Sequence, residues 1–227
     1  MSTLSHRYFV TGTDTDVGKT RVAAALALAL RRTGETPTFV KVVQTGAAPG
    51  AEGDAARAGV LAGVPHVELE RFEKPADPWS AALAAGATLQ ARDLAARIEL
   101  LEGALVVEGS GGIMVPLNER ERLVDVVRLA KLEVVLAVGL RLGCINHALL
   151  TLEACYETGI PVAGAMLVER WGSTDADYRD DVMRALQESA PIVGILPFAP
   201  VEADSVVAGA NLLLPFILLL PFRHRSE

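Results

Sequence analysis

The stretch Gly12-Thr-Asp-Thr-Asp-Val-Gly-Lys-Thr20 decides the fold of this chain. It follows the apolar residues 8–10 and precedes an Ala/Leu-rich segment over residues 22–30. A strand that breaks at glycine and continues through Gly-Lys-Thr into a helix is typical of a phosphate-binding loop. The N–H groups and dipole at the start of that helix favour anions, and Lys19 can reach the terminal phosphates of a nucleotide. Thr20 adds a hydroxyl for the magnesium ion that accompanies a nucleotide.

The spacing of this loop departs by one residue from the usual pattern G-x-x-x-x-G-K-[ST]. Counted back from Gly18, the first position is Thr13, and Gly12 lies one residue earlier. The strand, loop and helix context favours a nucleoside triphosphate site over a chance match. Asp14 and Asp16 would repel a polyphosphate, so the sequence predicts a cationic ligand or substrate beside them.

Length and composition favour one α/β domain over residues 1–227. Hydrophobic residues make up 51% of the chain and aromatic residues only 5%, so the core is expected to consist of Ala, Val and Leu. Such a core suits a parallel sheet that helices cover on both faces. A net charge of −7 argues against a surface that binds nucleic acid.

The cysteines and the two ends of the chain predict a cytoplasmic protein that binds no membrane. Cys144 and Cys155 fit no metal-ligand spacing and are expected to be small buried groups. Residues 1–7 lack the apolar core of a signal peptide. The apolar run 212–222 is too short to span a bilayer and contains two prolines, so we expect a tail that is buried or covered by a dimer partner.

Strand and helix patterns alternate along most of the chain. The expected strands are Tyr8–Thr11, Thr38–Val43, Ala104–Glu108, Val134–Val138, Val162–Val168 and Ile192–Leu196. The expected helices are Arg21–Arg32, Asp54–Ala62, Ala91–Leu101, Leu123–Lys131, Asn146–Thr158 and Asp177–Ser189, with loops over 46–53 and 74–80. Such alternation implies right-handed crossovers and a doubly wound, mainly parallel sheet of the P-loop NTPase type. Ligands of these sheets lie beyond the carboxyl ends of the strands.

Polar side chains interrupt or end two of the expected strands. Lys41 lies in a β-branched run, where its ammonium needs an anion unless it points to water from an edge strand. Thr45 follows it at the mouth of the sheet. Glu108 ends the next expected strand and matches the acid that faces magnesium in phosphate-loop enzymes, the alternative being a solvated side chain in a Gly-rich turn. Asp54 alone would be a helix cap, but with Thr20 and Glu108 it makes an oxygen ligand set for Mg²⁺.

A glycine turn at Gly143 leads into the helix expected from Asn146. Exposed N–H groups at that helix start would bind a carboxylate or another anion. Simple capping is the alternative for Asn146, and the neighbouring His147 is not expected to be catalytic.

At this point the chain resembles the dethiobiotin synthetases, phosphate-loop enzymes of biotin biosynthesis. The resemblance covers most of the chain and is carried by residues 8–20, by Lys41 with residues 45–46, and by residues 107–112 and 142–148. The family has the same extra residue after the first glycine of its loop. It implies an ATP-dependent ring closure, in which CO2 and one amine of 7,8-diaminopelargonate form a carbamate. The carbamate attacks the γ-phosphate, and the second amine then closes the cyclic urea.

The resemblance also implies roles for individual residues. The catalytic residues would be Lys41, Lys19 and Asp16. Nucleotide contacts would come from Asp16, Val17, Gly18, Lys19, Thr20, Arg21, Asp54, Val168, Glu169, Pro197, Phe198 and Ala199. Substrate contacts would come from Thr15, Thr45, Gly111, Gly143, Cys144, Ile145 and Asn146, the last four reaching the tail carboxylate from the partner subunit of a homodimer. Mg²⁺ would be held by Thr20, Asp54 and Glu108.

This chain departs from the family pattern at several positions. Asp16 stands where the family usually has glutamate, and Thr45 replaces a serine. Val168 stands where the family commonly has an asparagine that hydrogen-bonds the adenine. An apolar side chain cannot hydrogen-bond a base, so we expect weak selectivity among nucleoside triphosphates. The Leu-rich ending after Asn211 is also unexpected.

Two other classes of the same fold are less compatible with the sequence. Partitioning or localisation ATPases carry a signature lysine where this chain has Asp14, and they tend to end in a basic amphipathic helix. Synthetases linked to an amidotransferase are much longer chains with a glutaminase domain. A chain of 227 residues has no room for such a domain.

Overall fold

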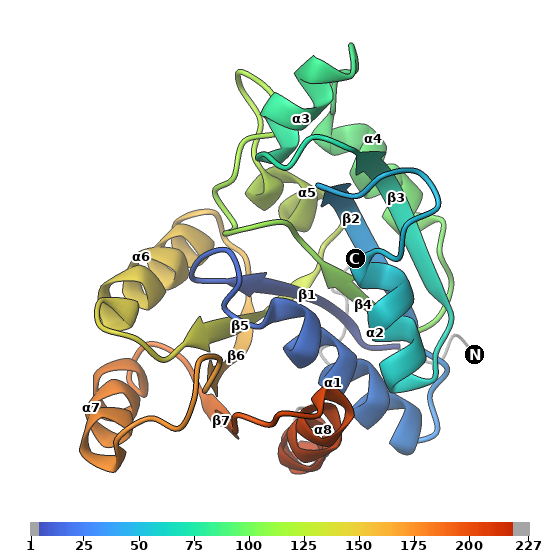
Figure 1. Cartoon of the computed structure of the whole chain (residues 1–227). Helices are drawn as coiled ribbons and strands as arrows, with labels where there is room; N and C mark the ends of the chain where they lie inside the picture. The colour runs from blue at the N-terminus through green and yellow to red at the C-terminus, as the bar shows by residue number, and fades with distance from the viewer. Residues whose placement is uncertain (1–4, 220–227) are drawn as a thin grey trace.

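A computed structural model describes residues 5–219 of the chain (Figure 1). Seven strands form one sheet in the order β3-β2-β4-β1-β5-β6-β7, and every neighbouring pair is parallel. The strands are β1 (Arg7–Gly12), β2 (Thr38–Thr45), β3 (His66–Phe72), β4 (Leu105–Glu108), β5 (Glu133–Gly139), β6 (Val162–Val168) and β7 (Ile192–Leu196). The helices are α1 (Lys19–Arg32), α2 (Asp54–Ala62), α3 (Pro78–Ala84), α4 (Ala91–Glu99), α5 (Leu123–Leu129), α6 (Cys144–Glu157), α7 (Ala176–Leu186) and α8 (Glu202–Leu219).

Helices cover both faces of the sheet, as the composition predicts (Figure 1). Side chains of α1, α2 and α8 share one apolar cluster with alternate strand residues such as Tyr8 and Val10. The remaining helices pack on the opposite face, where Phe9 of the same strand points. This alternation along β1 is the two-residue period of a strand that is buried on both sides. The prediction of a doubly wound α/β fold is confirmed.

The predicted strands and helices are all present, but three elements were missed. Strand β3 lies at the edge of the sheet, and its sequence His-Val-Glu-Leu-Glu-Arg-Phe alternates charged and apolar residues. A polar edge strand lacks the continuous apolar run of the inner strands, so its sequence gives no clear strand pattern. The segment 74–80 was predicted as a loop, which is wrong from Pro78 onward because α3 begins there.

The third missed element, α8, contains most of the apolar run near the end of the chain. It is a continuous helix that includes Pro215, so this proline does not end it. One side packs on α1, where Gly209 lies against Ala25 so closely that a side chain would not fit. By length and composition α8 could cross a membrane, but a core helix passes the same test, so this is weak evidence for a membrane span. Residues 220–222 of the predicted tail lie outside the described part of the chain.

Parallel pairing brings the polar ends of the strands to one edge of the sheet. In the register between β2 and β4, Lys41 lies beside Glu108, and on the other side of β4 Val10 lies beside Glu108. The phosphate loop follows β1 directly, so it begins next to the carboxyl end of β4. The candidate site therefore lies where ligands of doubly wound sheets bind.

Candidate active site

The loop between β1 and α1 has the backbone of a phosphate-binding loop. Gly18 precedes the helix with φ 97° and ψ 21°, a left-handed conformation that favours glycine. A Cβ at this position would also lie 2.9 Å from Val168 Cγ1, so glycine is required on both grounds. No side chain caps the start of α1. Its first N–H groups therefore remain available for an anion.

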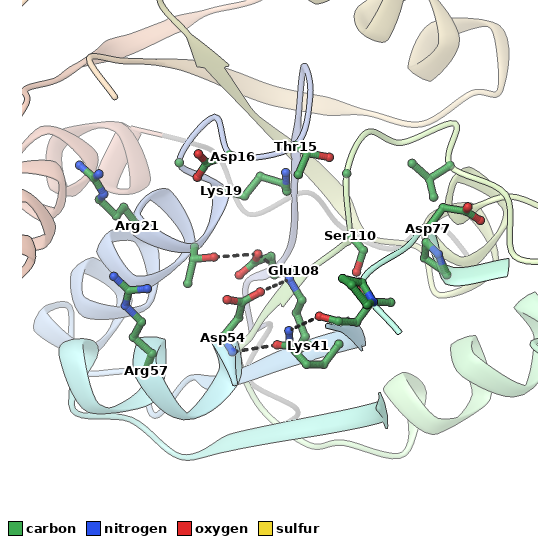
Figure 2. A pocket seen from close by; sticks show the side chains of 18 of the residues that line it. Thr15, Asp16, Lys19, Arg21, Lys41, Asp54, Arg57, Asp77, Glu108 and Ser110 are labelled. Carbon is green, nitrogen blue, oxygen red and sulfur yellow. Dashed lines mark hydrogen bonds and ion pairs between the residues drawn. The ribbon is translucent and has the colours of Figure 1, made fainter. Parts of the chain in front are cut away.

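Lys19 lies over this loop and faces the cavity (Figure 2). Its Nζ donates a hydrogen bond to the backbone oxygen of Asp14 at 2.7 Å. Burial lowers the pKa of this lysine, and the nearby carboxylate of Glu108 opposes that effect. An ammonium held by a single backbone oxygen has donors left for phosphate oxygens.

Lys41 is the centre of a buried ion-pair network beside the loop (Figure 2). It is only 3% exposed, and its Nζ lies 2.7 Å from Asp54 Oδ2 and 2.8 Å from Glu108 Oε1. Burial alone would lower the pKa of Lys41, but the two carboxylates outweigh it and raise the pKa. The alternative of an edge lysine in water is wrong, because β2 is an inner strand. Lys41 is therefore protonated at neutral pH.

Three oxygen-bearing side chains converge next to Lys41. Thr20 Oγ1 donates to Glu108 Oε1 at 2.9 Å, while Glu108 Oε2 is buried and has no hydrogen-bond partner. The alternative of a solvated Glu108 is wrong, since this residue is 1% exposed. The helix cap before Asp54 is Gly53, so Asp54 is not the cap and its carboxylate points to Lys41.

The same oxygens fit a magnesium ion. Glu108 Oε2 is buried without a hydrogen-bond partner, its other oxygen accepts from Thr20, and hydroxyl and carboxylate oxygens suit Mg²⁺. Within residues 5–219, no group of three or more His, Cys, Asp and Glu side chains could hold a metal ion. A magnesium site here would therefore also need the Thr20 hydroxyl and oxygens of the nucleotide.

These residues line a cavity of about 680 Å³ (Figure 2). The predicted site residues that line it are Thr15, Asp16, Gly18, Lys19, Thr20, Arg21, Lys41, Thr45, Asp54, Glu108 and Gly111. Its charged lining consists of five basic side chains (Lys19, Arg21, Lys41, Arg57, Arg170) and five acidic ones (Asp16, Asp54, Asp77, Glu108, Glu202). The numbers of basic and acidic side chains are equal, so the net charge of the lining favours neither anions nor cations. The positions of the charges then decide where each kind of ligand binds. Arg21 and Arg57 lie at one end, and Asp77 lies at the other (Figure 2).

The two acidic residues of the phosphate loop have partners within the protein. Asp14 pairs with Arg141, and Asp16 pairs with Arg170 at 2.9 Å. Arg141 also lies over the ring of Trp171, with 5.7 Å to the ring centre. The sequence predicted an external cation beside these carboxylates. In the structure, arginines from two other loops already offset their charge.

Six of the predicted nucleotide contacts, namely Val17, Val168, Glu169, Pro197, Phe198 and Ala199, do not line the cavity. Val17 and Val168 are buried, and the side chain of Val168 covers Gly18. Glu169 is also buried, and its carboxylate accepts hydrogen bonds from the Thr174 N–H at 2.9 Å, from Arg179 at 3.2 Å and from the Phe198 N–H at 3.5 Å. Glu169 thus ties the loop after β6 to the loop of Pro197, Phe198 and Ala199 that follows β7.

The predicted anion site at Gly143 also lies outside the cavity of its own chain. Gly143 precedes α6 with φ 92°, and no side chain caps this helix. Cys144 is buried as predicted, and its Sγ lies 3.5 Å from the hydroxyl of Tyr178. Ile145 and Asn146 follow in the first turn of α6. This helix start therefore serves the same cavity only if it comes from another copy of the chain.

Several residues that line the cavity were not predicted from the sequence. The polar ones are Gln44, Arg57, Asp77, Ser110, Arg170 and Glu202. Arg57 binds Glu202 through both Nε and Nη2, which joins α2 to the start of α8. Only Asp77 carried a local signal, because aspartate before proline is a common helix start.

A family model described as an AAA domain matches residues 6–204 of the chain. Two solved structures resemble the fold. A plasmid partition protein of Borrelia burgdorferi, bound to AMPPNP, has a TM-score of 0.61 at 8% identity, with 95% of this chain and 99% of that chain covered. The septum site-determining protein MinD of Pyrococcus horikoshii has a TM-score of 0.55 at 16% identity, covering 92% and 93%. At these identities the likeness shows the fold alone. Fold and site define a nucleotide-binding protein of the phosphate-loop class.

Comparison with sequence relatives identifies the family within this class. The ATP-dependent dethiobiotin synthetase of Nitrosospira multiformis is 40% identical over 199 residues, covering 84% of this chain and 88% of the relative. That of Pseudomonas aeruginosa strain UCBPP-PA14 is 42% identical over 169 residues, covering 69% and 74%. The chain belongs to the family of ATP-dependent dethiobiotin synthetases.

Proposed function

We propose that this chain acts as a single-domain, cytoplasmic homodimer that converts 7,8-diaminopelargonate, CO2 and ATP into dethiobiotin, ADP and phosphate, with Mg²⁺ as its cofactor. As a member of its family it is an ATP-dependent ligase of biotin biosynthesis. The observation that carries the proposal is the buried network of Lys41, Asp54, Glu108 and Thr20 beside the phosphate loop. A buried ammonium and carboxylate and hydroxyl oxygens next to a phosphate-binding loop support the binding of a nucleotide with its magnesium ion.

In the proposed reaction, the carbamate oxygen bonds to the γ-phosphorus and ADP leaves. The second amine then bonds to the carbamate carbon and gives up a proton, and the bond from that carbon to the phosphate oxygen breaks, so the ring closes and phosphate leaves with the proton. Negative charge would gather where carbamate meets triphosphate, and Lys19 and Lys41, which both line the cavity, would offset it. No nucleophilic side chain is needed, because aligning bound reactants can supply on the order of 7–11 kcal/mol.

Thr20, Asp54 and Glu108 would hold the magnesium ion. When bound, the ion would supply positive charge to the phosphate oxygens. Asp16 lines the cavity, which is compatible with a role beside the reacting groups. Its carboxylate is shared with Arg170, so a substrate ammonium would compete with that arginine.

The position of the α6 helix start supports the proposed homodimer. Residues 143–146 lie outside the cavity of their own chain, so a partner subunit would have to present their N–H groups to the tail carboxylate. Leu142 next to them is 94% exposed, and Leu149 and Leu150 further along α6 are also exposed. Exposed apolar side chains next to such a helix start are compatible with burial against a second copy.

A coupled assay of phosphate release tests the proposed function. With ATP, bicarbonate and Mg²⁺, we expect the purified protein to release phosphate only when 7,8-diaminopelargonate is present. The reason is that the attacking carbamate forms on the diamine. Phosphate release at the same rate without the diamine would contradict the proposal and favour a nucleotide-switch ATPase of the same fold.

The buried side chain at position 168 predicts weak discrimination between bases. Val168 packs on Gly18, and its backbone oxygen accepts a hydrogen bond from the Leu140 N–H at 2.9 Å. No polar side-chain atom at this position can hydrogen-bond the base. We expect CTP and GTP to bind within about 100-fold of ATP, roughly 2.7 kcal/mol. Competition binding with the three nucleotides measures this, and a larger preference for ATP would contradict it.

A further inference from the structure

The carboxylates that line the cavity differ in their partners. Four of the five belong to ion pairs: Asp16 with Arg170 at 2.9 Å, Asp54 and Glu108 with Lys41, and Glu202 with Arg57 at 2.5 Å. The fifth is Asp77. Within residues 5–219, no Lys, Arg or His side chain forms an ion pair with it. Asp77 is exposed to solvent where it lines the cavity, so its carboxylate is open to a cationic ligand.

Asp77 is the residue that precedes α3. Its Oδ1 accepts a hydrogen bond from the Ser80 N–H at 3.0 Å, and Pro78 follows at the first helical position. Partial burial would raise the pKa of Asp77, but the hydrogen bonds from Ser80 outweigh this and lower the pKa. The carboxylate is therefore ionised at neutral pH. Capping the helix needs only an oxygen acceptor, which asparagine or serine would also provide.

The position of Asp77 separates it from the basic end of the cavity. Arg21 and Arg57 lie at the α1 and α2 end, whereas Asp77 lies beyond Ser110 at the opposite end (Figure 2). The segment before Asp77 is fixed to the carboxyl end of β2, because the Gly46 N–H donates to the Lys74 backbone oxygen at 3.2 Å. This end of the cavity is therefore shared with residues at the end of β2 and in the loop after β4.

We propose that Asp77 binds a positively charged amino group of the substrate and so determines the affinity for a diamine. The inference rests on the proposed function, which supplies the diamine. A polyphosphate is attracted to the arginine end and repelled by Asp77, while an ammonium has the opposite preference. The two ends would thus orient the two reactants, with Lys19 and Lys41 between them.

The substitution Asp77→Asn tests the role of the negative charge at this position without removing the helix cap. Asparagine keeps the helix cap but loses the negative charge. We expect the KM for 7,8-diaminopelargonate to rise by about tenfold or more, since a charge-assisted hydrogen bond is lost. The KM for ATP and kcat should stay within about twofold, because the change does not reach the phosphates. Equilibrium binding of the diamine without ATP should weaken by the same factor and should depend less on salt.

Asp175→Asn is the matched control. Asp175 caps α7 by accepting from the N–H groups of Asp177 and Tyr178, and it does not line the cavity. It should leave both KM values unchanged. A wild-type affinity for the diamine in Asp77→Asn would overturn the inference and leave Asp77 as a helix cap, and so would an equal rise in both KM values. If the native protein itself shows no diamine-dependent phosphate release, the proposed function fails instead, and the binding measurement still decides whether Asp77 holds an ammonium.

Discussion

Replacing Lys41 by alanine is expected to lower kcat by about 100-fold or more, the size of effect seen when one preorganised charge donor is removed. Lys41 is protonated and holds Asp54 and Glu108 together at 2.7 and 2.8 Å. Without it, both carboxylates face the phosphate with no side-chain cation between them, and they repel the charge that develops during transfer. The KM for ATP should change less than kcat, because the phosphate loop and Lys19 still bind the nucleotide. Steady-state kinetics of phosphate release measures both.

The same change also removes a buried cation, which can cost about 3–5 kcal/mol of the free energy of unfolding. Lys41→Met keeps most of the side-chain volume and separates packing from charge. Thermal unfolding then shows whether either variant is folded at the assay temperature. Lys131→Asn is the control, since it removes an exposed lysine at a left-handed backbone position (φ 53°) that asparagine tolerates. Turnover of Lys41→Met close to the native rate would remove Lys41 from the mechanism.

The central part of the site could be predicted because its residues sit in strong local patterns. The phosphate loop follows an apolar strand and opens a helix, and Glu108 ends another apolar strand. The contact between Lys41 and Glu108 is visible in neither segment alone. It follows once both strands are placed in one parallel sheet, since their register makes these two residues neighbours.

The partners of the acidic loop residues could not be predicted from the sequence. Asp14 and Arg141 are 127 residues apart, and Asp16 and Arg170 are 154 residues apart. Arg141 lies next to the motif of residues 142–148 but outside it, and no local pattern connects either arginine to the phosphate loop. The sequence predicted a cationic ligand or substrate beside these carboxylates, whereas in the structure two arginines of the protein pair with them. The prediction assigned the positive charge to a ligand, because the loops that supply the arginines meet only in the folded protein.

Glu108→Gln is expected to raise the Mg²⁺ concentration for half-maximal activity by at least about tenfold, the effect of even outer-shell changes at metal sites. Glu108 Oε1 is shared by Thr20 and Lys41, whereas Oε2 is buried without a partner. Glutamine keeps the size of the side chain but is neutral. Its amide group would point N–H donors either at Lys41 or at the cation, and both arrangements are repulsive. Lys41 keeps its ion pair with Asp54, so the variant should remain folded.

The charge of Glu108 can be tested separately from turnover. Mg²⁺-dependent binding of ATP, measured by thermal shift or calorimetry, should weaken in Glu108→Gln, while binding of ATP without Mg²⁺ should be unchanged or slightly tighter because a negative charge has been removed. Glu99→Gln on the exposed side of α4 removes the same charge far from the cavity and should change neither measurement. If Glu108→Gln keeps the native Mg²⁺ dependence of both binding and turnover, the carboxylate at the end of β4 serves only to hold Lys41 and Thr20.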